Sequence, residues 1–264
     1  MNKSTAYSYI RIYLALMHRD LLIFMHSYPD YFVNITLWII FDVGVFAYIM
    51  PYFGLQGNFG TMILASVIAS LGIFEAMYNA ESFVADLDSE RQITYDLALP
   101  IPSLVVFLQR ASLYSTRMIF LSFFVLPIGK LLFWHKIDLS HFSLGYFLIV
   151  FVVAHCLYGF LALWLISFLK NIDSMRNIWI RLIMPLWVLG GYQFSWQAMH
   201  NIAPWLGYAM LANPIIYVTE AFRTAIMGQT GYINFWYCIM AMCIFSVFFA
   251  IRGTQLLKKR LDCL

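Results

Sequence analysis

Charge is scarce in this sequence. Only 11% of its 264 residues are Asp, Glu, Lys or Arg, whereas 62% are hydrophobic. A soluble domain of this size needs far more charge to cover its surface, so the composition argues against a soluble enzyme and predicts a polytopic membrane protein. The net charge of +3 indicates no nucleic-acid partner, because the basic residues fall at the ends of apolar runs, as in oriented membrane proteins.

Signatures of disulfides, metal sites and nucleotide binding are also lacking. The four cysteines lie within apolar runs or in the last residues, so we expect neither a disulfide framework nor a metal site. The sequence has no Gly-x-x-x-x-Gly-Lys-Ser/Thr loop, the segment that cradles nucleotide phosphates. We therefore expect that this chain is not itself an ATPase.

What the sequence does contain is six apolar segments that are long enough to cross a bilayer. They cover about residues 31–51, 60–84, 103–129, 144–168, 177–197 and 232–254. Ahead of them, residues 5–28 carry a basic stripe along one side, which predicts an amphipathic helix in the membrane interface that ends at Pro29. We expect an all-α fold in which residues 1–264 form a single transmembrane domain.

The basic residues are distributed unevenly between the two ends of these spans. Loops and span ends on one side collect eleven Lys and Arg residues, against three on the other side. Positively charged loops stay in the cytoplasm, and six spans return the chain to the side where it began. We expect both termini to be cytoplasmic, with no cleavable signal peptide, because charged residues interrupt the first thirty positions.

A polar loop at residues 86–100 interrupts the apolar texture after the second span. Its charged residues are Asp86, Asp88, Glu90, Arg91 and Asp96. The acidic run could chelate Mg²⁺ for a diphosphate substrate, form a short helix that contacts a partner, or be an ordinary solvated loop. A single acidic run without a second aspartate-rich motif weighs against the metal interpretation.

Residues 198–229 are too apolar and aromatic for a water-exposed loop, although they lie between two spans on the outer side. Short helices that dip back into the membrane are predicted, with Pro204 and Pro214 each at a first helical position and Asn213 as a cap. The second helix is expected to stop at Gly228. Glu220 and Arg223 stand three apart on one face of it, so they can pair with each other or cap an outer gate.

Five charged residues fall inside or beside the spans, where charge is costly unless it is paired or hydrated. They are Asp42, Glu75, Glu81, Arg110 and Arg117. The two arginines are seven residues apart on the third span, and the two glutamates are six apart on the antiparallel second span. We expect cross-span ion pairs between them, with contact to a substrate or a proton relay as alternatives.

Aromatic residues gather around the last two spans. Tyr192, Trp196 and Tyr217 could line a passage for sugars, although Trp and Tyr also belt the interface in most membrane proteins. Tyr192 is the first of these to test, because it follows the Gly190-Gly191 break.

Two motifs resemble the membrane subunit of type 2 ABC exporters. Before the last span, Ala203-Pro204 is followed by Pro214-Ile215-x-Tyr217 and then Arg223, which is similar to that family's outer segment. After the second span, Glu90-Arg91 precedes Ile93-Thr94-Tyr95-Asp96 and a Leu-rich stretch that ends at Pro100. Ile93 replaces the family's usual glycine, and Phe194 and Trp196 stand where small residues are usual.

The expected architecture is also similar, with an interfacial N-terminal helix, six spans, a short inner loop after the second span and re-entrant helices before the last. The resemblance therefore covers nearly the whole chain, and it implies a transporter permease with no enzymatic activity and no cofactor on this chain itself. Loop 86–100 would be a coupling helix seated on a separate ABC ATPase subunit, present in two copies and holding the ATP and Mg²⁺. Two copies of this chain would form a homodimeric permease among the lipids of a bacterial inner membrane. The cargo would be amphipathic, with a lipid-linked glycan or polysaccharide first and a drug or lipid second. An ATP-independent secondary transporter or a membrane-embedded transferase remains the alternative class.

Overall fold

The structure, a computed structural model, describes residues 3–54, 57–89, 91–169 and 172–261, and every regular element in these ranges is helical. Among them are five helices long and apolar enough to cross a membrane. These are Tyr7–Phe53, Phe59–Leu87, Ser103–Leu132, Leu144–Ile166 and Phe235–Leu261. The expectation of an all-α protein with several membrane-spanning helices is confirmed at this level.

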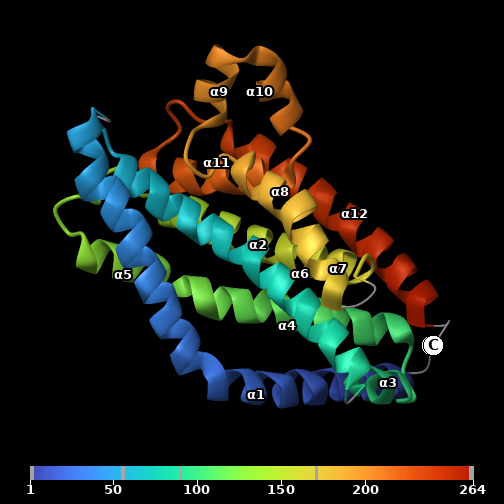
Figure 1. Cartoon of the computed structure of the whole chain (residues 1–264). Helices are drawn as coiled ribbons and strands as arrows, with labels where there is room; N and C mark the ends of the chain where they lie inside the picture. The colour runs from blue at the N-terminus through green and yellow to red at the C-terminus, as the bar shows by residue number, and fades with distance from the viewer. Residues whose placement is uncertain (1–2, 55–56, 90, 170–171, 262–264) are drawn as a thin grey trace.

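The chain begins with one long helix rather than with two. Helix α1 covers Lys3–Gly44 and continues through Pro29, and the π turn η1 (Val45–Ile49) and the 3₁₀ turn η2 (Met50–Phe53) follow it. The expected helix end at Pro29 is therefore wrong. A proline inside a helix removes one hydrogen bond and favours a kink. Figure 1 shows α1 running along the base of the molecule and then turning upward.

Helices α2 (Phe59–Asp88) and α4 (Ser103–Phe123) pack together and are joined by the short helix α3 (Gln92–Leu97). Helix α5 (Val125–Leu132) continues α4 after a bend at Phe124. The polar loop predicted at residues 86–100 thus contains a six-residue helix. In Figure 1 this helix lies at the base of the molecule, beside the first part of α1.

The segment after α6 (Leu144–Ile166) differs from the expected fifth span at residues 177–197. Helix α7 (Ile172–Ile178), the π turn η3 (Trp179–Ile183) and α8 (Met184–Val188) form a short helical run that ends before Gly190-Gly191. This run is not among the five long apolar helices. Figure 1 shows it leading away from the base toward α9 and α10.

Three short helices precede the last long one. Helices α9 (Trp196–Ile202) and α10 (Pro204–Met210) form a pair at the top of Figure 1, above α11 (Pro214–Met227), and α12 (Phe235–Leu261) leads back to the base. Pro204 and Pro214 open α10 and α11 as predicted, and Gly228 ends α11. The Asn213 side chain accepts a hydrogen bond from the Ile215 N–H at 2.9 Å, which confirms the predicted cap.

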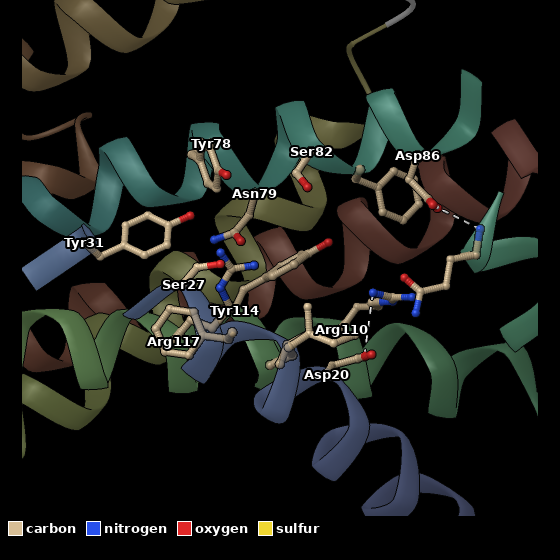
Figure 2. A pocket seen from close by; sticks show the side chains of 15 residues that line it. Asp20, Ser27, Tyr31, Tyr78, Asn79, Ser82, Asp86, Arg110, Tyr114 and Arg117 are labelled. Atoms are coloured by element: carbon tan, nitrogen blue, oxygen red, sulfur yellow. Dashed lines mark hydrogen bonds and ion pairs between the residues drawn. The ribbon is translucent and has the colours of Figure 1, made fainter. Parts of the chain in front are cut away.

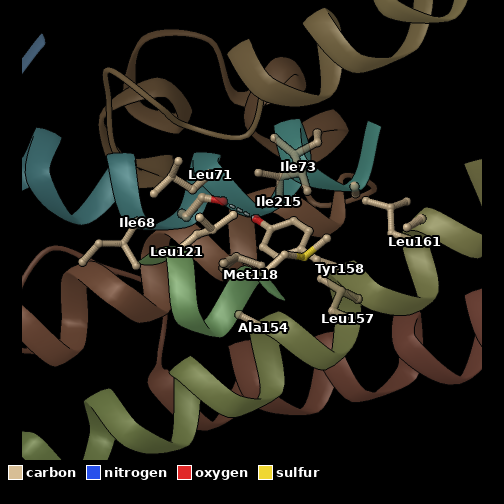
Figure 3. Packing of buried hydrophobic residues seen from close by; sticks show 14 of the residues in the cluster. Ile68, Leu71, Ile73, Met118, Leu121, Ala154, Leu157, Tyr158, Leu161 and Ile215 are labelled. Carbon is tan, nitrogen blue, oxygen red and sulfur yellow. Dashed lines mark hydrogen bonds between the residues drawn. The ribbon is translucent and has the colours of Figure 1, made fainter. Parts of the chain in front are cut away.

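Helix α2 is the centre of the bundle and packs against α4, α6 and α11. Where it packs on α6, the Tyr158 hydroxyl donates a hydrogen bond to the Ala69 carbonyl of α2 at 2.6 Å (Figure 3). Gly72 makes this approach possible, because a Cβ atom there would lie 2.0 Å from the Tyr158 ring. A rigid α2 therefore connects the base with the region below α9 and α10.

Candidate functional sites

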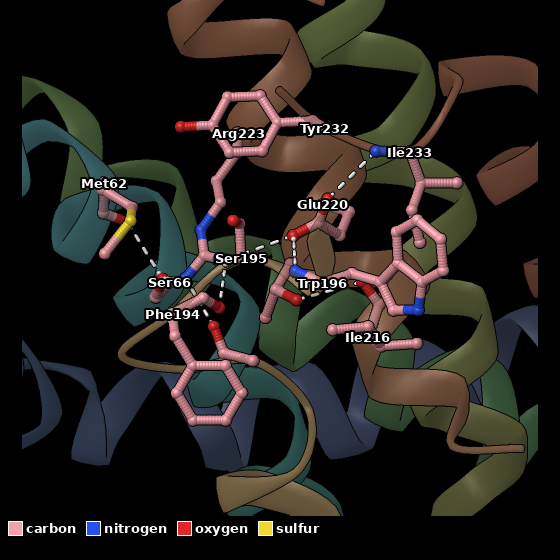
Figure 4. A network of polar contacts seen from close by, with 12 residues as sticks. Met62, Ser66, Phe194, Ser195, Trp196, Ile216, Glu220, Arg223, Tyr232 and Ile233 are labelled. Atoms are coloured by element: carbon pink, nitrogen blue, oxygen red, sulfur yellow. Dashed lines mark hydrogen bonds and ion pairs between the residues drawn. The ribbon is translucent and has the colours of Figure 1, made fainter. Parts of the chain in front are cut away.

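The first candidate site is a buried polar network around Arg223 on α11, which is fully inaccessible to solvent. Its guanidinium donates hydrogen bonds to the Ser66 hydroxyl on α2 at 2.7 Å and to the Phe194 carbonyl at 2.8 Å. It also bonds the carbonyls of Tyr192 and Gly191. Figure 4 shows the side chain reaching from α11 into the loop that precedes α9. Arg223 thus fixes that loop between α11 and α2.

Glu220 completes the Arg223 network one helical turn away. Its carboxylate lies 3.3 Å from Arg223 and accepts hydrogen bonds from the backbone N–H groups of Trp196 and Ile233, both at 3.0 Å. Burial raises the pKa of the Glu220 carboxyl, and the charge of Arg223 and both N–H donors oppose that rise. The pair therefore joins α11 to the first residue of α9 and to the approach of α12, as Figure 4 shows.

The three aromatic residues predicted for a passage are all engaged in this region. The Trp196 indole donates to the Gly207 carbonyl at 2.8 Å, and the Tyr217 hydroxyl donates to the Leu211 carbonyl at 2.8 Å. Tyr192 is buried, and its hydroxyl bonds Asp42 on α1. This hydrogen bond gives the Asp42 carboxylate a partner inside the bundle. A role for the three aromatic residues in a passage stays a prediction.

The second candidate site, which we call the α3 cluster, consists of Arg19, Asp20, Asp96 and Arg110. Asp96, on α3, is 2% exposed and accepts two hydrogen bonds from Arg19 at 3.1 and 3.2 Å, and one from Arg110 at 2.6 Å. Asp20 lies 2.8 Å from Arg19 and accepts a further bond from Gln109 at 3.0 Å. A single carboxylate on α3 is thus bonded to both α1 and α4.

The predicted ion pairs between the second and third spans are wrong as assigned. Arg110 pairs with Asp96 and Asp20 instead of Glu75 or Glu81. The tertiary fold explains the difference. Helix α1 and helix α3 bring Asp20 and Asp96 within ion-pair distance of Arg110, whereas the two glutamates of α2 lie farther away. Arg19, Asp20 and Gln109 were missed by the sequence reasoning, and the adjacent Arg19-Asp20 pair on the amphipathic helix was the available signal.

The acidic run before α3 has a structural role at Asp86. Its carboxylate accepts the backbone N–H groups of Gln92 at 3.1 Å and Ile93 at 3.3 Å, donors that a helix start leaves free. Asp88 is the last residue of α2, and Glu90 lies outside the described residues. Arg91 adopts the left-handed conformation with φ 55° and is exposed. Across the described ranges, no group of three or more metal-ligating side chains occurs.

A polar cavity of about 250 Å³ lies between α1, α2 and α4, and Figure 2 shows the side chains that point into it. Asp20 and Arg110 of the α3 cluster line one end. Arg117 lies at the other end, 5.0 Å from the centroid of the Phe24 ring and 6.0 Å from that of Tyr78. Arg117 thus lies against aromatic rings rather than in the predicted ion pair.

No family model matches this sequence, and no curated protein matches it as a relative.

Proposed function

We propose that this chain is the membrane subunit of an ATP-driven exporter of the type 2 ABC class that its motifs resemble. The observation that carries the proposal is the position of Asp96, whose carboxylate bonds Arg19 of α1 and Arg110 of α4 from a short helix at one end of the bundle. In the proposal, the buried Asp96–Arg110 pair and the partly exposed Arg19 hold α3 in one arrangement relative to α1 and α4. A force applied to α3 would therefore reach both long helices.

The outward surface of α3 suits a protein partner. Tyr95 is 73% exposed, and Thr94 beside it is exposed as well, although the opposite face of α3 is buried through Ile93 and Asp96. A separate ATPase subunit that binds this surface would supply ATP and Mg²⁺. Its closure on ATP would push α3, and α1 and α4 would shift together as a rigid body.

The arrangement of the helices supports opposite roles for the two ends. Figure 1 places α3, the first part of α1 and the end of α12 at the base, and α9 and α10 at the top. In the proposal, the short run α7 to α8 is a sixth crossing, so that both termini are cytoplasmic. Helices α9 to α11 then form a re-entrant outer lid, which the Arg223 network fastens to α2.

Two copies of the chain would form the transport pathway in a bacterial inner membrane, each with one ATPase subunit. Large apolar side chains are exposed on α1 and α12, including Phe41 at 68% and Ile244 at 63%, and these faces suit lipid or a second copy. The proposed cargo is amphipathic, and a lipid-linked glycan is the first class to test.

The experiment is to purify the tagged chain, identify the ATPase that accompanies it, and reconstitute the complex in liposomes with a candidate lipid-linked glycan. Export that requires ATP, and that stops when the catalytic glutamate of the ATPase is replaced by glutamine, is the expected result. Transport without ATP, or failure to bind any ATPase, would overturn the proposal and favour a secondary transporter.

A further inference from the structure

The cavity between α1, α2 and α4 contains a cation with no matching acceptor. Arg117 makes no hydrogen bond or ion pair within the part of the chain that the structure describes, and its Nε atom is buried without a partner. A guanidinium has five N–H donors, and leaving buried donors unpaired is costly. Its contacts with the Phe24 and Tyr78 rings leave these donors available to a ligand in the cavity.

Other groups around Arg117 are also unsatisfied or free to bond. Asn79 is 1% exposed, and its amide donates to the Glu75 carbonyl at 2.7 Å while its Oδ1 atom has no partner. Figure 2 shows Asn79, Ser27, Tyr31 and Arg117 converging on the same space. The donors of Arg117, the hydroxyl groups of Ser27 and Tyr31 and the unpaired acceptor of Asn79 thus come from three helices and meet at one point.

Two acidic residues that line the cavity already accept hydrogen bonds from protein donors, so their carboxylates are not paired with Arg117. Asp20 already accepts bonds from Arg19 and Gln109, and Asp86 accepts two backbone N–H groups of α3. Glu75 acts on Arg117 electrostatically without approaching to ion-pair distance. Arg110 also lines the cavity, and its Nε atom is buried without a partner. Among the described residues that line the cavity, the buried atoms without a partner are the Nε atoms of Arg110 and Arg117 and the Oδ1 atom of Asn79, so two of these three are arginine donors.

The cavity opens between α1 and α2. Ser27 and Ser82 line it and are exposed, and Ile23 beside them is 62% exposed. An apolar residue next to two hydroxyl groups suits a molecule with a polar head and an apolar tail. The volume of about 250 Å³ holds a phosphate group together with part of a substituent.

We propose that this cavity binds a phosphate-type anion, with Arg117 as the principal ligand and Ser27, Tyr31 and Ser82 as hydroxyl partners. Arginine forms strong charge-assisted hydrogen bonds to phosphate oxygens. The anion is the head of a membrane lipid that enters between α1 and α2, or a soluble phosphate. This site goes beyond the proposed export function, because it requires neither ATP nor a partner subunit.

The test measures binding to the purified full-length chain. One arm titrates inorganic phosphate into protein in a nonionic detergent and follows it calorimetrically. The other incorporates the protein in nanodiscs of phosphatidylcholine with 10% phosphatidic acid and determines retained phosphatidic acid by native mass spectrometry. In whichever of the two measurements the wild-type protein binds its ligand, Arg117→Gln is expected to weaken binding about tenfold or more, because a charge-assisted hydrogen bond is lost. Binding in the first arm identifies a soluble phosphate, and binding in the second alone identifies a lipid.

Three variants control this experiment. Arg252→Gln removes an exposed arginine of α12 and should leave binding unchanged. Glu75→Gln removes a nearby negative charge and should strengthen binding, which a general loss of structure cannot produce. Ser82→Phe obstructs the opening at an exposed position and should abolish binding even if Arg117→Gln fails to fold. Equal binding by wild type, Arg117→Gln and Ser82→Phe, or no binding in either arm, would overturn the proposal whatever the outcome of the ATP experiments.

Discussion

At the scale of single residues, Arg223 shows how a charge can be accommodated in an apolar bundle. One guanidinium, fully inaccessible to solvent, is surrounded by three carbonyls, a hydroxyl and a carboxylate, so that its donors are almost all used. The three carbonyls belong to the loop before α9, which has no regular secondary structure and needs donors for them, whereas the hydroxyl and the carboxylate belong to α2 and α11. The arginine therefore organises the loop at the same time as the loop neutralises the arginine.

Replacing Arg223 by methionine should destabilise the protein by about 3–5 kcal/mol, because Glu220 is left as an unpaired buried charge. Thermal unfolding in detergent, followed by circular dichroism, measures the change. The double variant Glu220→Gln with Arg223→Met should recover part of the loss, since the uncompensated charge is gone. Arg252→Met, at an exposed position, serves as control. A melting temperature of Arg223→Met equal to that of wild type would contradict the structural role of the network.

Gly72 provides a second prediction at this scale. Gly72→Ala would place a Cβ atom 2.0 Å from the Tyr158 ring, so α2 and α6 must separate, at a cost of about 1–3 kcal/mol. The matched control is Gly145→Ala, because a Cβ atom there meets nothing within 4 Å. The control should be neutral or stabilise by up to about 1 kcal/mol. Equal melting temperatures for the two variants would show that the close packing of α2 on α6 is wrong.

At the scale of elements, α3 is too short to be stable by its own hydrogen bonds, so tertiary contacts hold it in place. Asp86 satisfies its first N–H groups, and Asp96 fastens it to α1 and α4. Its position therefore depends on these charged side chains together with the burial of Ile93. Such an element can be displaced as a unit when a partner pushes on it.

Asp96→Asn should loosen α3 while the rest of the bundle stays folded. We expect ATP-driven transport by the reconstituted complex to fall at least about tenfold, because an amide cannot hold two arginines as a carboxylate does. Size-exclusion chromatography and hydrogen exchange of residues 91–99 distinguish uncoupling from unfolding. Glu81→Gln removes an exposed carboxylate of α2 and should change neither quantity. Faster exchange without loss of transport would argue against coupling through Asp96.

Local signals predicted several elements of this fold, and tertiary contacts decided the others. The starts of α10 and α11 and the end of α11 follow from Pro204, Pro214 and Gly228, whose backbone constraints act locally. Pro29 was expected to end a helix for the same reason, but α1 continues through it. Arg110 pairs with Asp20 and Asp96, which lie outside the second and third spans. The spacing of charged residues along those two spans therefore could not predict its partners.

At the scale of the whole molecule, the sequence predicts several apolar helices because long runs without charge have few alternatives. The structure of residues 177–197 was harder to predict from the sequence, because a π turn and the Gly190-Gly191 turn leave a shorter helical run than the expected span. The Arg223 network was only half predicted: the spacing of Glu220 and Arg223 indicated their pairing, whereas Ser66 and the backbone partners depend on the fold.

The proposed orientation can be tested with single cysteines at two exposed positions, in a background where the native cysteines are replaced by alanine. Tyr208 on α10 is 65% exposed, and Tyr95 on α3 is 73% exposed. A membrane-impermeant maleimide added to intact spheroplasts should label position 208 alone, and position 95 should react only after lysis. Labelling of both positions before lysis, in cells shown to be sealed, would contradict the placement of α3 and α10 on opposite sides.

Photocrosslinking from α3 tests the coupling of this chain to an ATPase most directly. A photoreactive amino acid is placed at position 95 or at position 208, the membranes are irradiated, and the captured proteins are identified by mass spectrometry. We predict that position 95 captures an ABC ATPase subunit, with a yield that changes when ATP is trapped, and that position 208 captures none. The proposed function would be contradicted if position 95 captured no ATPase, or if position 208 captured one.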